Sequence, residues 1–253
     1  TAGFTAIGPH FQTMTLGGRR IEVSGLRLGD ASVEGMILVL RDTTELHRLE
    51  RVRTDFVANA SHELKTPISA LRGFVDTVID DTEMPAETRR TFLVRSQQQI
   101  HRLASIVQDL LQLSRLDTGY SPDSDKTLVL SDVVHQVHLT KITDAEMKQV
   151  QLICDTSPEC QQHSIQGRAD DLALMLSNLI DNAIKYSDHG GTVSLALTMN
   201  GEGLIQFNVT DQGVGIPAEE HDKIFERFYR VDPARSRNKG GTGLGLSIVK
   251  HVV

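Results

Sequence analysis

The sequence has 253 residues, and its 26 Lys and Arg against 33 Asp and Glu give a formal net charge of −7, which argues against a nucleic-acid binder that works by charge. This length allows one large or two modest domains, and no apolar run approaches the roughly 20 residues that cross a bilayer. The two cysteines are too few for a disulfide framework.

The N-terminal segment, up to about residue 44, has the sequence pattern of β-strands. Three β-type runs are predicted, at Phe11–Leu16, Arg20–Leu28 and Met36–Arg41. Gly17-Gly18 separates the first two runs, as a hairpin turn would. A slip in the apolar alternation at Ser24-Gly25 predicts a bulge. So few strands rarely fold alone, and we interpret this segment as the end of a domain that begins earlier.

The next segment has a helical period, and Asp42, Thr43 or Thr44 can cap its first helix. The apolar residues of this helix recur mostly at steps of three and four, as in a coiled-coil seam. They are Leu46, Leu49, Val52, Phe56, Ala60, Leu64, Ile68, Leu71, Val75 and Val78. Between Val52 and Ile68 every step is four, which should disturb the supercoil.

A turn over Asp80–Pro85 leads into a second helix, with Pro85 in its first turn and Gly119 as its C-cap. The apolar residues of this helix are Leu93, Ile100, Leu103, Val107 and Leu110. Two helices with such narrow apolar faces favour a homodimeric four-helix bundle. A monomeric hairpin packed on neighbouring parts of the chain is the alternative.

Residues 120–126 form a polar linker. Helices and strands alternate after it, which is typical of an α/β layer domain. The expected helices are Ser131–Met147, Ala169–Tyr186 and one from Gly245, and the expected strands are Val150–Cys154, Thr192–Met199 and Leu204–Asp211.

The first helix carries a candidate nucleophile. At about 100° per residue, His62 lies opposite the apolar positions Ala60 and Leu64, so its imidazole should face solvent. Pro67 removes a helical hydrogen bond nearby and bends the helix. An exposed imidazole beside the Glu63 carboxylate can act as a nucleophile, because the carboxylate can take the proton. Taken alone, a plain surface histidine is the commoner explanation.

Three later segments suit a nucleotide. Asn178 and Asn182 share one helix face and offer the oxygen ligands that Mg²⁺ takes together with phosphates. Asp211 ends a strand before two glycines, where backbone can approach a flat ligand. The run Gly240–Leu246 leads into a helix N-terminus, as phosphate sites do. Each segment alone has a plainer explanation: a helix surface, an Asp-Gly turn, or a loop that matches neither the Rossmann fingerprint nor the P-loop.

Together and in this order, five segments closely resemble the motifs of the two-component sensor histidine kinases. They are the H box His62–Pro67, the N box Asn178–Ser187, the first glycine box Asp211–Ile216, the F box Phe225–Arg230 and the second glycine box Gly241–Leu246. The match covers Leu46–Val253 and looks most like the class that senses phosphate limitation or cell-wall status. The N-terminal strands resemble the end of a PAS domain.

The resemblance implies an α+β multidomain fold. It would comprise a PAS-like remnant (1–44), a helical hairpin that forms a dimeric four-helix bundle (45–119), a linker (120–126) and an ATP-binding domain (127–253). The last domain is expected to be an α/β sandwich of the histidine kinase, gyrase and chaperone type. The family normally continues with a final β-hairpin after Val253, so we expect those strands to be missing. The parent would be a membrane-bound sensor with this portion in the cytoplasm.

The resemblance also implies roles for single residues. His62 would accept the phosphoryl group from ATP, Glu63 would be its general base, and Thr66 would position water to dephosphorylate a response regulator. Asn178 would hold Mg²⁺. Asn182 and Lys185 would lie near the phosphates and Tyr186 near the nucleoside, while Asp211 would bind the adenine amine in a pocket shaped by Gly213, Gly215 and Ile216. Phe225 and Phe228 would anchor a lid that carries Arg230, Arg235, Arg237 and Lys239. The residues that would cradle phosphate are Gly241, Thr242, Gly243, Leu244, Gly245 and Leu246.

Two rival functions remain open. An ATPase of the same nucleotide-binding fold, as in topoisomerases, chaperones or mismatch-repair proteins, would explain the later motifs but not a helical hairpin with His62 before Pro67. A scaffold with a decayed kinase domain would not explain the intact Asn178 and Asp211. Whether the phosphoryl group reaches His62 in cis or in trans also remains open.

Overall fold

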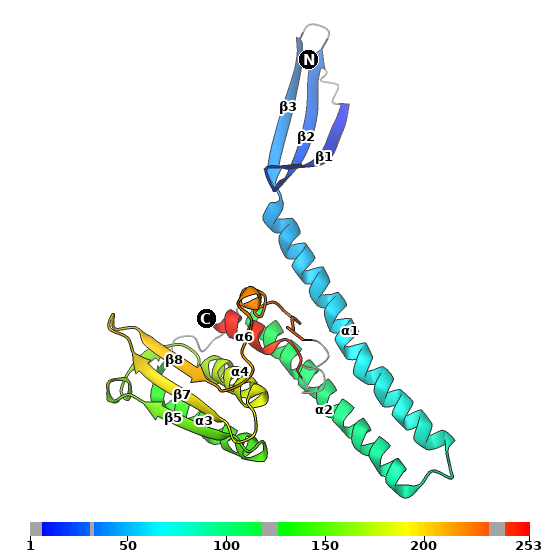
Figure 1. Cartoon of the computed structure of the whole chain (residues 1–253). Helices are drawn as coiled ribbons and strands as arrows, with labels where there is room; N and C mark the ends of the chain where they lie inside the picture. Colours follow the sequence, from blue (N-terminus) through cyan, green and yellow to red (C-terminus); the bar gives the residue numbers. More distant parts are fainter. Residues whose placement is uncertain (1–6, 31–32, 118–125, 233–240) are drawn as a thin grey trace. The chain divides into compact units, whose positions relative to one another are not determined.

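A computed structural model describes residues 7–30, 33–117, 126–232 and 241–253. The packing divides into two compact units, one ending at His62 and one beginning at Glu63. The long helix α1 (Thr44–Asp80) passes from the first unit into the second (Figure 1). Among the described residues, no helix combines the length and the apolarity that crossing a bilayer requires.

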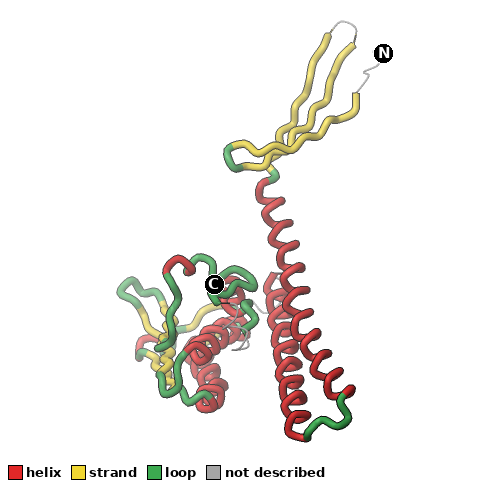
Figure 2. The backbone as a smooth tube through the Cα atoms, turned by 45° about the vertical axis from the view of Figure 1, so that its right-hand side comes forward, coloured by secondary structure: helices red, strands yellow, loops and turns green. Residues whose placement is uncertain are grey.

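The first unit is an antiparallel meander that leads into α1 (Figure 2). Its strands are β1 (Ile7–Leu16), β2 (Arg19–Asp30) and β3 (Val33–Asp42). Gly17 and Gly18 have φ values of 56° and 79°, as the two central residues of a type I′ hairpin turn require. The predicted strands and their first turn are therefore confirmed.

The predicted bulge at Ser24-Gly25 is wrong. β2 pairs with β3 without interruption through these residues, and the irregularity lies in β1, between Ile7 and His10. β2 is the middle strand, so an extra residue there would break two ladders, whereas in the outer strand β1 it breaks only one.

The junction between the sheet and α1 is held by hydrogen bonds. The Thr44 backbone N–H and hydroxyl donate to Asp42 Oδ1 at 3.0 and 2.6 Å, and the Thr43 N–H donates to the Arg20 carbonyl at 2.8 Å. The Thr44 hydrogen bonds hold the pKa of the Asp42 carboxyl below its ordinary value. Asp42 thus binds the first turn of α1, as the predicted cap required.

In the second unit, α1 continues without interruption through Pro67, which is buried, and a turn joins it to α2 (Ala86–Asp117). The Phe74 and Phe92 rings pack with their centroids 5.9 Å apart. Arg89 Nη2 lies 3.4 Å from the Met84 carbonyl oxygen and closes the turn. The helix predicted after Pro85 is confirmed, whereas its predicted Gly119 cap and most of the 120–126 linker lie outside the described residues.

The rest of the second unit is an α/β domain. Its elements are β4 (Thr127–Val129), α3 (Leu130–Met147), β5 (Gln151–Thr156), η1 (Pro158–Cys160), β6 (Ser164–Gln166), α4 (Ala169–Tyr186), β7 (Thr192–Met199), β8 (Ile205–Thr210), η2 (Ala218–Glu220) and α6 (Gly245–Val252). The main sheet has the order β5-β7-β8, with β5 parallel and β8 antiparallel to β7. The predicted helices and strands are confirmed; the short pair β4–β6 was not predicted, because three residues carry no period.

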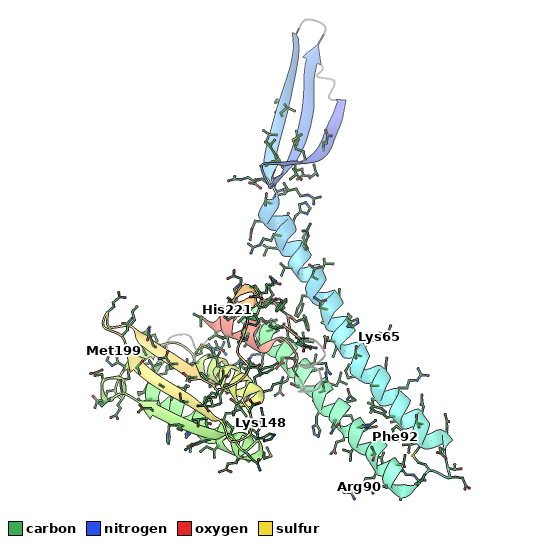
Figure 3. All side chains as sticks on the ribbon, viewed as in Figure 1. Lys65, Arg90, Phe92, Lys148, Met199 and His221 are labelled. Carbon is green, nitrogen blue, oxygen red and sulfur yellow. The ribbon has the colours of Figure 1, made fainter. Side chains whose placement is uncertain are left out.

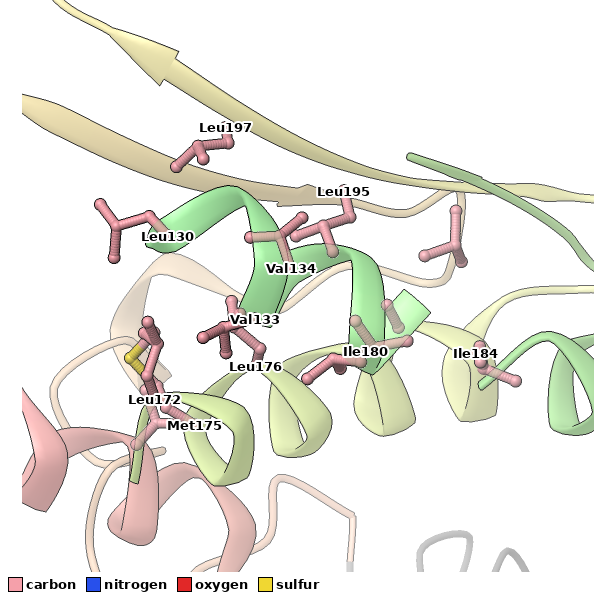
Figure 4. Close-up of a cluster of buried hydrophobic side chains, with 14 of the residues drawn as sticks. Leu130, Val133, Val134, Leu172, Met175, Leu176, Ile180, Ile184, Leu195 and Leu197 are labelled. Atoms are coloured by element: carbon pink, nitrogen blue, oxygen red, sulfur yellow. The ribbon is translucent and has the colours of Figure 1, made fainter. Parts of the chain in front are cut away.

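The core lies where α3 and α4 cover one face of this sheet (Figure 4). Val193, Leu195 and Leu197 alternate along β7 and are fully buried, as are Leu176 and Ile180 on α4. Each such side chain contributes about 1.5–3 kcal/mol relative to an exposed one. This packing fixes the rotation of α4, and so determines which of its side chains point away from the sheet.

Candidate functional site

The polar face of α4 meets the start of α6. Asn178 donates from Nδ2 to the Leu174 carbonyl at 2.9 Å, which orients its amide. A Cβ placed on Gly245 would lie 2.7 Å from Asn178 Oδ1 and 3.7 Å from Asn182 Nδ2. Only glycine permits so close an approach. The structure therefore brings the predicted asparagine pair and the second glycine box together.

The first glycine box packs against the C-terminal end of the same helix. A Cβ on Gly213 would lie 2.6 Å from the Tyr186 carbonyl oxygen and 2.8 Å from Asp211 Oδ1. The Gly213 N–H donates to Asp211 Oδ1 at 2.8 Å. Gly215 follows with a φ of 70°. Asp211 is exposed and Tyr186 half-buried, so the carboxylate is held by its own loop beside the end of α4.

The F box is joined to the second glycine box through the backbone. The Phe228 N–H donates to the Gly243 carbonyl at 2.8 Å, and a Cβ on Gly243 would lie 2.8 Å from the Phe228 carbonyl carbon. Phe228 has a φ of 65°, a conformation that costs a bulky residue about 1–3 kcal/mol. This contact holds together the two ends of the segment that the motifs identify as the lid.

The other predicted ligands lie around these contacts. Thr242 is buried, and its hydroxyl accepts from the Leu244 N–H at 3.2 Å. Ile216 and Phe225 are exposed, whereas Lys185, Gly241 and Leu246 are half-buried. The predicted lid residues Arg235, Arg237 and Lys239 lie outside the described residues.

The H box presents an exposed His62, as predicted, and an exposed Thr66. The carboxylate of Glu63 is nearly buried, and its Oε2 accepts from Arg230 Nη2 at 2.8 Å and from Arg102 Nη2 at 3.3 Å. Arg230 also donates to the Thr242 carbonyl at 2.9 Å. Hydrogen bonds between ionised groups are strong when water is largely excluded, so these arginines fix the residue that follows His62.

Two family profiles match this chain. The "His Kinase A (phospho-acceptor) domain" matches residues 52–119, and the "Histidine kinase-, DNA gyrase B-, and HSP90-like ATPase" matches residues 167–253. The SenX3 sensor-like histidine kinase of Mycolicibacterium smegmatis is 40% identical over 85% of the chain and 55% of the relative. The phosphate regulon sensor PhoR of Pseudomonas aeruginosa is 34% identical over 86% and 48%.

The chain belongs to the two-component sensor histidine kinases. It spans 38% of a further relative, the WalK sensor histidine kinase of Bacillus subtilis, at 34% identity over 92% of its own length. It therefore represents between about a third and a little over half of the curated relatives named here.

Solved histidine kinases share the fold of the second unit's two parts. AdeS of Acinetobacter baumannii matches with a TM-score of 0.57 at 25% identity, over 76% of this chain and 85% of that one. ShkA, solved in complex with AMPPNP, matches with a TM-score of 0.52 at 25% identity, over 80% and 40%. ThkA, in complex with the response regulator protein TrrA, matches with a TM-score of 0.56 at 20% identity, over 88% and 68%. The recognition from the motifs is confirmed, as is the predicted combination of a helical hairpin with an α/β domain.

Sequence reasoning missed several charged residues on α2, a helix that contacts α6. Asp117 Oδ1 lies 2.7 Å from Arg227 Nη2 and 3.3 Å from His251 Nε2. Burial raises the pKa of the Asp109 carboxyl, against a hydrogen bond with Thr242 that lowers it. Asp109 shares a helix face with the fully buried Ile106 and Leu113. A carboxylate on an apolar face was the signal that could have identified it.

Proposed function

We propose that this chain transfers the γ-phosphoryl group of Mg-ATP to His62 and then to an aspartate of a response regulator, and that it also dephosphorylates that regulator. The observation that carries the proposal is the convergence on α4. Asn178 meets the second glycine box, and the carbonyl of Tyr186 meets the first, in a chain that also contains a phosphoacceptor domain.

The nucleotide would lie along the exposed side of these contacts. Asn178 suits Mg²⁺, because its Nδ2 is engaged by a backbone carbonyl and its Oδ1 faces the glycine box with a hard oxygen ligand. When bound, Mg²⁺ neutralises charge on the phosphates. Asn182 and Lys185 would contact phosphate oxygens, and Tyr186 would contact the nucleoside.

Adenine would be bound by Asp211. The Gly213 N–H already holds one carboxylate oxygen, and this orients the group to accept a hydrogen bond from an exocyclic amine. Gly215 and Ile216 would shape this pocket. The backbone of the second glycine box, leading into α6, would supply N–H donors to the phosphates, with Phe225 and Phe228 anchoring the lid above them.

The chemical step would be an in-line displacement. An imidazole nitrogen of His62 attacks the γ-phosphorus, the new P–N bond forms, and the bond to the oxygen of departing ADP breaks. Glu63 would take the imidazole proton as general base. Arg230, which binds Glu63 in this structure, links the base of the lid to the H box.

The exposed side chains of the hairpin support two protein partners, a second copy of the chain and a receiver domain. Ile68, Leu93 and Ile100 are 50%, 53% and 53% exposed in the single chain, as expected of side chains that a second copy would cover in a four-helix bundle. A receiver domain would dock near the exposed His62, and Thr66 would position the water for dephosphorylation. We further propose that the chain is the cytoplasmic portion of a membrane-bound sensor.

Incubation with γ-labelled ATP and Mg²⁺ tests this function. We expect acid-labile, base-stable label on the wild-type chain and none on His62→Gln, because a phosphoryl group on a ring nitrogen is lost in acid. His101→Gln, which replaces another exposed histidine of the hairpin, serves as the control and should label normally. Label that persists in His62→Gln would contradict the assignment, and phosphate release without any labelled protein would favour a plain ATPase.

A further inference from the structure

Lys148 lies directly after α3, beside the C-terminal end of α4 (Figure 3). Its Nζ donates to the carbonyl oxygens of both Ile184 and Lys185. Its own carbonyl oxygen lies 3.0 Å from His189 Nδ1. The Lys148 ammonium thus joins the end of one helix to the end of the helix that carries the N box.

This contact replaces a helix cap that the sequence lacks. The last carbonyls of a helix have no partner within it, and many helices satisfy them with a glycine in the left-handed conformation. α4 is followed instead by Ser187, with φ −66° and ψ 152°, whose N–H binds only the Ala183 carbonyl. A cation at the carbonyls of the last turn is also favoured by the helix dipole.

The peptide units that Lys148 holds lead directly to the proposed nucleotide site. They precede Lys185 and Tyr186, whose side chains lie together with Lys185 Nζ 5.5 Å from the Tyr186 ring centroid. The next carbonyl, that of Tyr186, is the group against which Gly213 packs. A shift of the last turn would therefore move both the N-box side chains and the loop that orients Asp211.

The loop around Lys148 is itself held in place. Gln149 has a φ of 59°, and its carbonyl accepts from the Gly190 N–H at 2.8 Å, while the Gln151 N–H donates to the Gly191 carbonyl at 2.9 Å. The backbone next to Lys148 is therefore hydrogen-bonded to the segment that follows α4. A lysine on a flexible loop would lose more backbone entropy in forming the same bonds.

We propose that Lys148 is a positioning residue for nucleotide binding: without contacting the nucleotide, it holds the last turn of α4 so that Lys185, Tyr186 and the Asp211 loop are aligned. This inference rests on the proposed function for the location of the nucleotide. It assigns a task to a residue outside all five motifs.

The test compares Lys148→Met with Lys148→Arg in the full chain. In Lys148→Met, we expect the KM for ATP and the Kd for Mg-ADP to rise about tenfold, with kcat changed by less than about threefold. Lys148→Arg keeps the charge and the donors, so it should restore both constants to within about threefold of wild type.

Lys141→Met is the matched control. Lys141 also contacts α4, with its Nζ 2.6 Å from Asp181 Oδ1, but it binds a side chain in mid-helix and not the terminal carbonyls. We expect its Kd for Mg-ADP to stay within about twofold of wild type. Thermal unfolding of all three variants shows whether each remains folded.

Three results would overturn the inference: a wild-type Kd in Lys148→Met, a lowered melting temperature in that variant with unchanged Kd and KM, or an equal rise of Kd in Lys141→Met. Binding of Mg-ADP does not depend on phosphoryl transfer. A wild-type chain that binds ADP but never labels His62 would therefore overturn the proposed function alone.

Discussion

The α/β domain and the helical hairpin differ in how far they bury their apolar side chains. In the α/β domain, Leu176, Ile180 and Leu195 have no exposed surface, because two helices and a sheet enclose them. In the hairpin, Ile68 and Ile100 expose half of their surface. Two helices alone present too narrow a seam to bury such residues on each other.

This difference in burial indicates which part is stable by itself. The core that holds α4 against the sheet is built from residues of the α/β domain itself, so we expect the orientation of α4 not to depend on the hairpin. The hairpin keeps apolar surface available, and its stability should depend on what covers that surface. An α/β domain with an enclosed core and a hairpin with an uncovered apolar seam fit the proposed transfer of a phosphoryl group between partners.

The largest expected effect is in the enclosed core. Ile180→Ala should lower the free energy of unfolding by about 2–5 kcal/mol, because it removes buried methylene groups and leaves a cavity between α4 and the sheet. Urea unfolding followed by circular dichroism measures this loss. Leu204→Ala, which truncates a side chain that is 59% exposed, is the control and should cost less than about 0.5 kcal/mol. Equal costs would contradict the contrast between enclosed and exposed positions.

A smaller effect is expected in the hairpin, and it should depend on protein concentration. Ile100→Ala should lower the melting temperature by an amount worth about 1–2 kcal/mol and shift sedimentation equilibrium toward the monomer, because the lost contacts would be with a second copy. Gln97→Ala changes an exposed polar residue of the same helix and should have neither effect. A melting temperature independent of concentration in the wild type would argue for the monomeric hairpin.

Much of the α/β domain could be predicted because its patterns are strong. The bounds of α4 and β7 agree residue for residue with the sequence prediction, since one follows the 3.6-residue period and the other alternates with period two. The glycines of the site could also be predicted, because close backbone approach admits no other residue, as Gly213 and Gly245 show.

The features that were missed depend on contacts between distant segments. The backbone of Phe228 is left-handed where its N–H donates to the distant Gly243 carbonyl, and no local pattern predicts this conformation. Lys148 and Arg102 act through partners 36 or more positions away in the sequence. The bulge was misplaced because the alternation in β2 was read without knowing that β2 is the middle strand.

The smallest effect, and the one with a characteristic pH dependence, is expected at Asp109, where the hairpin meets the α/β domain. Burial raises the pKa of this carboxyl above its ordinary value of 3.8, so the ionised form is disfavoured in the folded state. Asp109 therefore lowers the free energy of unfolding at pH values above its folded pKa. This unfavourable contribution disappears as the pH falls below the ordinary pKa. Asp109→Asn keeps a polar group for Thr242 without the charge. Urea unfolding at pH 7 should show a more stable variant, with the gain shrinking as the pH approaches about 4.

Asp42 provides the matched control with the opposite sign. Hydrogen bonds from Thr44 lower the pKa of Asp42, so its contribution is favourable above the ordinary pKa and is lost as the pH falls through the folded value. Asp42→Asn should therefore destabilise the chain at pH 7, and the difference from wild type should vanish in acid. If both variants changed the free energy of unfolding in the same direction at pH 7, the contrast between the partly buried Asp109 and the exposed Asp42 would be wrong.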